Sequence, residues 1–122
     1  MPKKVLVADD DIPIVRMIEY KLKDSGMEVI CAFDGQEAME KTLEVLPNLV
    51  ISDISMPEID GLELTRRLKT YPETKDIPVI ILTSRGEDEQ KEEAKGAGVH
   101  EFITKPFVPS KLLEIVKRMV GE

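Results

Sequence analysis

The stretch VLVADDD, residues 5–11, decides the fold class of this chain, because four apolar residues run directly into three carboxylates. Continuous apolar character, without alternation, is typical of a parallel strand that is buried on both faces. Four further apolar runs follow, namely VICAF (29–33), LVIS (49–52), VIILT (79–83) and the shorter FIT (102–104). Runs of this kind, separated by longer segments, predict an α/β domain whose parallel sheet is covered by helices on both faces.

Most of the segments between the runs carry helix signals. Asp34 and Glu37 have capping-box spacing at the start of the second segment, and Asp60 and Glu63 repeat that spacing in the third. The last segment begins near Pro109, and proline is favoured in a first helical turn. In the first segment, the apolar residues that recur at helical spacing are Val15, Ile18 and Leu22.

The fourth segment, residues 87–98, differs from the others in composition. Its sequence EDEQKEEAKGAG offers only two small apolar residues, Ala94 and Ala97, to pack against a sheet. A helix there would be lightly anchored, and low local packing suits an element that moves. A solvated surface helix is the alternative that this composition leaves open.

The bulk composition indicates one soluble domain over residues 1–122. Hydrophobic residues make up 42% and charged residues 34%, which is typical of a globular chain. A net charge of −7 argues against nonspecific binding to nucleic acid, and no apolar run reaches the length of a membrane span. The N-terminus MPKKVLVADD does not resemble a signal peptide, and the single cysteine, Cys31, cannot form an internal disulfide. We therefore expect a cytoplasmic location.

Polar side chains follow four of the five apolar runs. They are Asp9 and Asp10 after the first, Asp53 after the third, Thr83 and Ser84 at the end of the fourth, and Lys105 after the fifth. Sites in open α/β sheets form beyond the carboxyl ends of the strands, so we expect these groups to converge on one cleft.

This set of residue types suits phosphoryl chemistry with a divalent cation. Mg²⁺ prefers oxygen ligands, which Asp10, Asp53 and the backbone carbonyl of Ser55 would provide. A carboxylate also acts as a nucleophile toward phosphorus and forms an aspartyl phosphate. Lys105 and Thr83 would then bind the phosphoryl oxygens.

These residues lie in motifs that match a known family. With VADD at the first run, ISDISMPEIDG around the third, ILTSRG at the fourth and FITKPF at the fifth, the chain resembles the receiver domain of two-component response regulators from end to end. The resemblance implies a flavodoxin-like, doubly wound fold, with a five-stranded parallel sheet in the order 2-1-3-4-5 and five helices.

The resemblance also implies a role for each residue of the predicted site. Asp53 would be the phosphoacceptor that takes the phosphoryl group from the histidine of a sensor kinase. Asp10 would bind Mg²⁺ directly, with Mn²⁺ as a substitute, while Asp9 would act through water and Ser55 through its main-chain oxygen. Lys105 would pair with the phosphoryl group, and its peptide bond to the following proline is expected to be cis.

The same resemblance assigns a switch and an output surface. Thr83 and Phe102 correspond to the switch pair, and Ser84 would contribute to phosphoryl binding. The output surface would consist of the segment 87–98, the strand 102–104 and the helix that begins at Pro109. A receiver of this kind would control a downstream protein or output domain without contacting nucleic acid or membrane itself, as a monomer or a phosphorylation-dependent dimer. It would be a regulatory phosphoacceptor that catalyses only its own phosphorylation and dephosphorylation.

Two other functions remain open at this point. One is a Mg²⁺-dependent phosphatase with an aspartate nucleophile, but such enzymes carry a DxD arrangement on one strand, whereas Asp53 is followed by Ile54 and Ser55. The other is a nucleotide- or flavin-binding domain, which requires a glycine-rich loop after the first strand. The sequence DDDIP at that point contains no glycine.

Overall fold

The computed structural model describes residues 2–84 and 95–122. It contains one parallel sheet of five strands in the order β2-β1-β3-β4-β5, as predicted. The strands are β1 (Lys4–Ala8), β2 (Glu28–Ala32), β3 (Leu49–Asp53), β4 (Val79–Thr83) and β5 (Glu101–Thr104). Each apolar run locates a strand correctly, because the strand bounds differ from those of the run by no more than one residue at either end.

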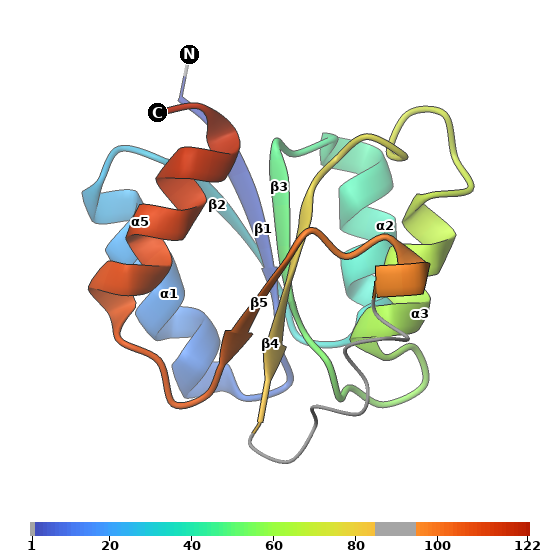
Figure 1. Ribbon diagram of the computed structural model, residues 1–122, viewed down its shortest axis with the longest axis horizontal. Coiled ribbons are helices and arrows are strands. Elements are labelled where there is room, and N and C mark those ends of the chain that lie inside the picture. The colour runs from blue at the N-terminus through green and yellow to red at the C-terminus, as the bar shows by residue number, and fades with distance from the viewer. Residues whose placement is uncertain (1, 85–94) are drawn as a thin grey trace.

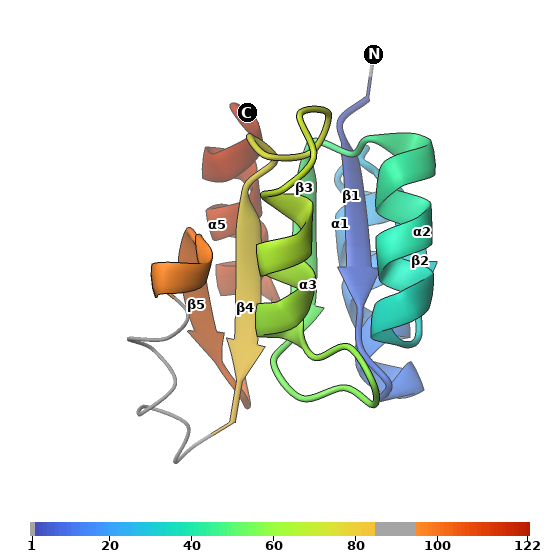
Figure 2. The same cartoon turned by 90° about the vertical axis from the view of Figure 1, so that its right-hand side faces the viewer.

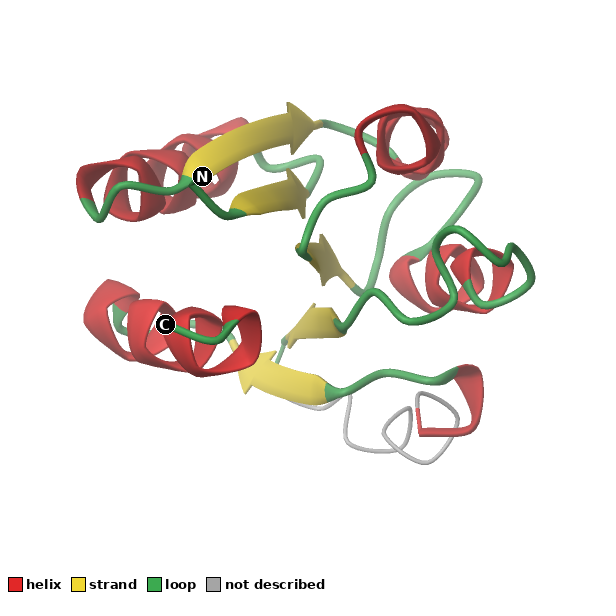
Figure 3. Ribbon diagram, turned by 90° about the horizontal axis from the view of Figure 1, so that it is seen from above, coloured by secondary structure: helices red, strands yellow, loops and turns green. Residues whose placement is uncertain are grey.

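Helices cover both faces of this sheet. α1 (Ile12–Asp24) and α5 (Pro109–Val120) pack on one face, and α2 (Gly35–Val45) and α3 (Gly61–Leu68) pack on the other (Figures 1 and 3). The helix expected over residues 87–98 lies largely outside the described residues, and residues 95–97 are helical. No helix in the described part of the chain is long and apolar enough to cross a membrane.

Alternate residues of the strands divide the core into two layers. Val5 and Val7 pack in the layer beneath α1 and α5, whereas Leu6 and Ala8 pack in the layer beneath α2 and α3. The central strands β3 and β4 are buried at every position. The edge strands β2 and β5 are half-buried at most positions, unlike the prediction of strands buried on both faces. Each edge strand has a neighbour on one side only, so its side chains are covered less completely.

The predicted caps determine where the helices begin. Asp34 Oδ1 accepts a hydrogen bond from the Glu37 N–H at 2.7 Å, and Glu37 Oε1 accepts one from the Phe33 N–H at 2.6 Å. Asp60 Oδ1 likewise accepts from the Glu63 N–H at 2.8 Å. The bonds from the Glu37 and Glu63 N–H groups satisfy helix donors that have no intrahelical partner, and the bond from Phe33 completes the capping box of α2. Pro109 is the first residue of α5, as expected.

The parallel arrangement brings the carboxyl ends of all five strands to one edge of the molecule, opposite the two chain termini (Figures 1 and 2). The loops that leave this edge carry the polar residues that the sequence places after the apolar runs.

Candidate functional site

Three carboxylates meet at the carboxyl ends of the adjacent strands β1 and β3. Asp9 follows β1, Asp53 is the last residue of β3, and Asp10 comes directly after Asp9. One carboxylate oxygen from each of the three lies within 4.8 Å of the others. Asp9 is completely buried and Asp53 is 7% exposed, whereas Asp10 is exposed. The convergence expected for the first and third strands is therefore present.

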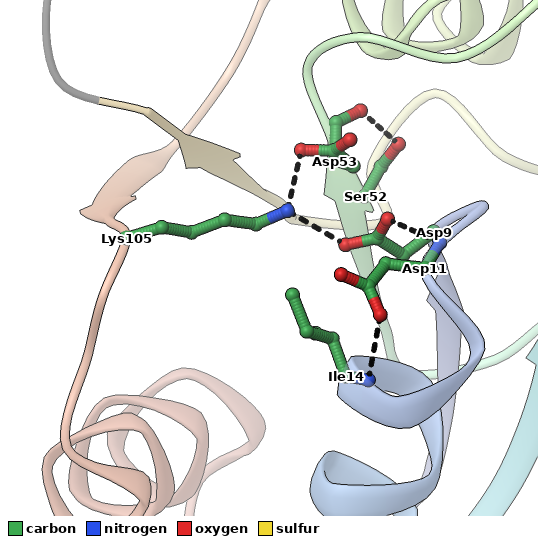
Figure 4. A network of polar contacts seen from close by, with 6 residues as sticks. All are labelled: Asp9, Asp11, Ile14, Ser52, Asp53 and Lys105. Atoms are coloured by element: carbon green, nitrogen blue, oxygen red, sulfur yellow. Dashed lines mark hydrogen bonds and ion pairs between the residues drawn. The ribbon is translucent and has the colours of Figure 1, made fainter.

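Lys105 joins two of these carboxylates. Its Nζ atom lies 2.9 Å from Asp9 Oδ2 and 3.0 Å from Asp53 Oδ1 (Figure 4). Lys105 follows β5. Because β3 and β4 lie between β5 and β1 in the sheet, the side chain of Lys105 has to extend across the strand ends to contact Asp9. The Lys105 N–H donates to the Thr83 carbonyl at 2.6 Å, and the Lys105–Pro106 peptide bond is cis, as expected.

Burial shapes the charge state of the cluster. It raises the pKa of the Asp53 carboxyl to about 6; the Lys105 ammonium opposes this rise, and the Asp9 carboxylate adds to it. Burial also raises the pKa of Asp9, despite the N–H of Asp11 and the ammonium of Lys105. Burial lowers the pKa of Lys105, but the two carboxylates outweigh that effect and raise it. Among the described residues, the cluster therefore holds more negative charge than the Lys105 ammonium neutralises.

The donor set fits a hard divalent cation. Mg²⁺ is bound in proteins by one or two carboxylates with carbonyl and water oxygens, and three carboxylates within reach of one another supply such ligands. Asp10 and Ser55 line the same open groove beside the cluster, together with Met56, Pro57 and Asp60. A cation here would relieve the charge imbalance that burial creates.

Of the two predicted switch residues, Thr83 ends the strand β4, whereas Phe102 lies inside β5 and pairs in register with Ile81. Thr83 is 2% exposed, and its hydroxyl lies 3.5 Å from the hydroxyl of Thr104 on β5, its register partner. Phe102 is partly buried against the core layer of α2 and α3. Ser84 follows Thr83 and is exposed. The Thr83 hydroxyl thus lies at the same edge of the sheet as the acid cluster, whereas the Phe102 ring packs two residues before the end of β5.

Asp11 is not part of the acid cluster. Its Oδ1 atom accepts a hydrogen bond from the Ile14 N–H at 3.3 Å and caps α1, while its own N–H donates to Asp9 Oδ1 at 2.9 Å (Figure 4). The three adjacent acids of the opening motif therefore divide into two that belong to the site and one that starts a helix.

Two features of the site were not predicted from the sequence. The convergence of Lys105 with the acids was expected, but its ion pair with Asp9 was not, because it joins the ends of strands that are not neighbours. A Cβ atom at Gly61 would lie 2.3 Å from the carbonyl oxygen of Asp53, so only glycine fits against this strand end. The only sequence pattern that could have indicated this close contact is the dipeptide Asp60–Gly61 after the third run, but the same dipeptide is equally consistent with an ordinary helix cap.

Known proteins share both the sequence and the fold of this chain. The family model described as "Response regulator receiver domain" matches residues 5–117. The phosphate regulon transcriptional regulatory protein PhoB of Rhizobium meliloti is 36% identical over 120 residues, which are 98% of this chain and 53% of that protein. The alkaline phosphatase synthesis transcriptional regulatory protein PhoP of Bacillus subtilis is 35% identical over 98% of this chain and 49% of its own length. The chain thus spans about half the length of these curated relatives.

Two solved structures match along almost their whole length. The chemotaxis protein CheY4 of Vibrio cholerae superposes with a TM-score of 0.92 at 35% identity, covering 98% of this chain and 99% of that one. A putative response regulator from Chloroflexus aurantiacus superposes with a TM-score of 0.93 at 34% identity, covering 100% of both chains. Because the family model matches residues 5–117 and the flavodoxin-like fold is shared, this chain belongs to the receiver domain family of two-component response regulators.

Proposed function

We propose that this receiver accepts a phosphoryl group on Asp53, from a phosphohistidine of a sensor kinase, with Mg²⁺ bound beside it. One observation carries the proposal: the Asp53 and Asp9 carboxylates share the Lys105 ammonium while a third carboxylate, that of Asp10, lies within metal-binding distance of both. Receivers of this family are typically phosphorylated on aspartate in the presence of Mg²⁺, and the donors found here match that chemistry.

Each side chain has a defined task in the transfer. A carboxylate oxygen of Asp53 attacks the phosphorus, the P–N bond to the kinase imidazole breaks, and the imidazole departs with the bond electrons. Lys105 already contacts Asp53 Oδ1 at 3.0 Å, and it would remain beside that residue to pair with the new phosphoryl oxygens. Asp10, Asp53 and the Ser55 carbonyl would hold the metal, with Asp9 acting through water. The cation supplies positive charge next to the phosphoryl oxygens.

Thr83 and Phe102 would convert phosphorylation into a change of surface. The Thr83 hydroxyl, which now lies beside Thr104, would turn to the phosphoryl group, and the partly buried Phe102 ring would move into the vacated space. Such an event is local and electrostatic but is read out as repacking. The output surface would comprise the segment 87–98, β5 and α5. Arg118 of α5 and Glu101 of β5 already form an ion pair across it at 2.9 Å.

The proposed partners follow from this role. A sensor histidine kinase would supply the phosphoryl group, and a downstream protein or output domain would bind the switched surface, with the receiver acting as a monomer or as a phosphorylation-dependent dimer. The curated relatives are named as transcriptional regulators and are about twice as long as the matched region. With a net charge of −7, this domain itself is not suited to contact DNA phosphates.

A phosphodonor assay tests the assignment of Asp53. The protein is incubated with Mg²⁺ and acetyl phosphate, and intact mass spectrometry measures the addition of one phosphoryl group. We expect stoichiometric labelling of wild type and none of Asp53→Asn. Asp11→Asn is the matched control, because it also removes one negative charge near the cluster while asparagine preserves the helix cap. Labelling that persists in Asp53→Asn would exclude this site, and rapid turnover of assorted phosphate esters would instead support a phosphatase.

A further inference from the structure

We infer that Gly35, the first residue of α2, is a positioning residue for the metal site, because it leaves room for the loop that carries Ser55. This loop, residues 54–60, joins β3 to α3 and lines the groove beside the acid cluster. Figure 2 shows it passing close to the end of α2 that faces the carboxyl ends of the strands. The inference rests on the proposed function, since it concerns the oxygen that Ser55 would offer to Mg²⁺.

The contact between Gly35 and the loop is too close for any side chain. A Cβ atom on Gly35 would lie 1.9 Å from the carbonyl oxygen of Ile59 and 2.7 Å from its Cβ. Real Cβ atoms essentially never approach another heavy atom within 3.0 Å, so one of the two elements would have to retreat by more than 1 Å. By comparison, a Cβ on Gly96 would meet nothing within 4 Å.

The start of α2 is held in place and would not yield easily. Asp34 Oδ1 accepts from the Glu37 N–H at 2.7 Å, and Glu37 Oε1 accepts from the Phe33 N–H at 2.6 Å. One turn further, Lys41 Nζ donates to the Cys31 carbonyl of β2 at 2.7 Å and pairs with Glu37 at 3.1 Å. Because these bonds tie α2 to the sheet, the displacement would fall on the loop.

The loop would move as a unit. The Gly61 N–H donates to the Ile54 carbonyl at 3.0 Å and closes the loop, and the Ile59 N–H donates to the Pro57 carbonyl at 2.8 Å. Glu58 is in the left-handed region with φ of 66°, so the turn has little conformational freedom to absorb a shift. A displacement of Ile59 is therefore transmitted to Ser55, whereas the three carboxylates at the ends of β1 and β3 keep their places.

Gly35→Ala tests this inference, with Gly96→Ala as the matched control. Titration calorimetry of the metal-free proteins measures Mg²⁺ affinity, and acetyl phosphate labelling at saturating Mg²⁺ measures whether Asp53 remains competent. We expect Gly35→Ala to bind Mg²⁺ about tenfold more weakly than wild type. Loss of a group that supports a metal ligand typically lowers metal affinity by about 10- to 100-fold, and this change is expected at the lower end of that range. It should still label to the wild-type extent once Mg²⁺ is saturating, and Gly96→Ala should match wild type in both measurements.

The outcomes separate this inference from the proposed function. Wild-type Mg²⁺ affinity in Gly35→Ala would overturn the inference alone. So would weaker binding accompanied by lost labelling at saturating Mg²⁺, because that pattern indicates a general disruption. An absence of Mg²⁺ binding by wild type would overturn both. Should Gly35→Ala not fold, Ile59→Ala tests the other half of the inference, the coupling of Ile59 to Ser55, because Ile59 is only 5% exposed and anchors the loop in the core. Unchanged Mg²⁺ affinity in Ile59→Ala would then refute the inference.

Discussion

Asp53→Asn should make the metal-free protein more stable at neutral pH, although it removes the residue that we propose as the phosphoacceptor. The pKa of Asp53 is raised from 3.8 to about 6, chiefly by burial, so the ionised carboxylate destabilises the native state. At about 1.4 kcal/mol per pKa unit, a rise of about 2 units corresponds to about 3 kcal/mol. Asparagine resembles the protonated acid in shape and carries no charge, so it avoids this penalty.

The sign of the pH dependence follows from the same shift. The folded state holds the Asp53 proton more tightly than the unfolded state, so the penalty is absent below about pH 4, develops between about pH 4 and pH 6, and is complete above pH 6. Urea denaturation in the presence of a chelator, at several pH values across this range, measures the difference between the variant and wild type.

Relative to wild type, we expect the free energy of unfolding of Asp53→Asn to be higher by about 3 kcal/mol at pH 7.5, which corresponds to roughly 10 °C in melting temperature. At pH 4 we expect no difference between the two proteins. The exposed control Asp11→Asn should match wild type at each pH. Added Mg²⁺ should stabilise wild type, because it binds the folded state preferentially, and should thereby reduce the difference in stability between Asp53→Asn and wild type. An Asp53→Asn protein no more stable than wild type at pH 7.5, or equally stabilised at pH 4, would refute the reasoning.

Three further substitutions probe the surroundings of the site. Lys105→Met should destabilise the metal-free protein by about 3 kcal/mol in urea titrations, because Asp9 and Asp53 lose their shared counter-charge. Added Mg²⁺ should reduce this loss of stability. Gly61→Ala should cost about 2 kcal/mol in the same assay, because its Cβ would lie 2.3 Å from the Asp53 carbonyl oxygen; a neutral effect would contradict that packing. Asp34→Ala should cost about 1 kcal/mol by thermal unfolding through loss of the α2 cap, whereas Asp34→Asn should be nearly neutral.

The sequence predicts the convergence of the site because parallel strands end at one edge of a sheet. Asp9, Asp10, Asp53 and Lys105 each follow an apolar run, and all four meet in the structure. The strand order itself came from the family resemblance, since periodicity does not reveal which strands are neighbours. For the same reason, the half-buried edges β2 and β5 could not be distinguished from the central strands by their apolar runs.

Contacts between distant segments were beyond prediction from local patterns. The hydroxyls of Thr83 and Thr104 meet only because β4 and β5 pair in one particular register. The close approach of Gly35 to Ile59 depends on how α2 and the β3–α3 loop pack, whereas the sequence shows only a glycine after a capping aspartate. Such contacts are set by tertiary packing, which overrides what one segment can indicate.

Mapping the phosphorylated residue tests the central claim most directly. After reaction with acetyl phosphate and Mg²⁺, borohydride reduces an acyl phosphate to an alcohol and thereby marks the carboxylate that carried the phosphoryl group. Peptide mass spectrometry then distinguishes Asp53 from Asp9 and Asp10, the other two carboxylates of the cluster. We predict that the reduced residue is Asp53 alone and that omitting Mg²⁺ abolishes the modification. Reduction at Asp9 or Asp10, or the absence of any modified carboxylate under these conditions, would contradict the account.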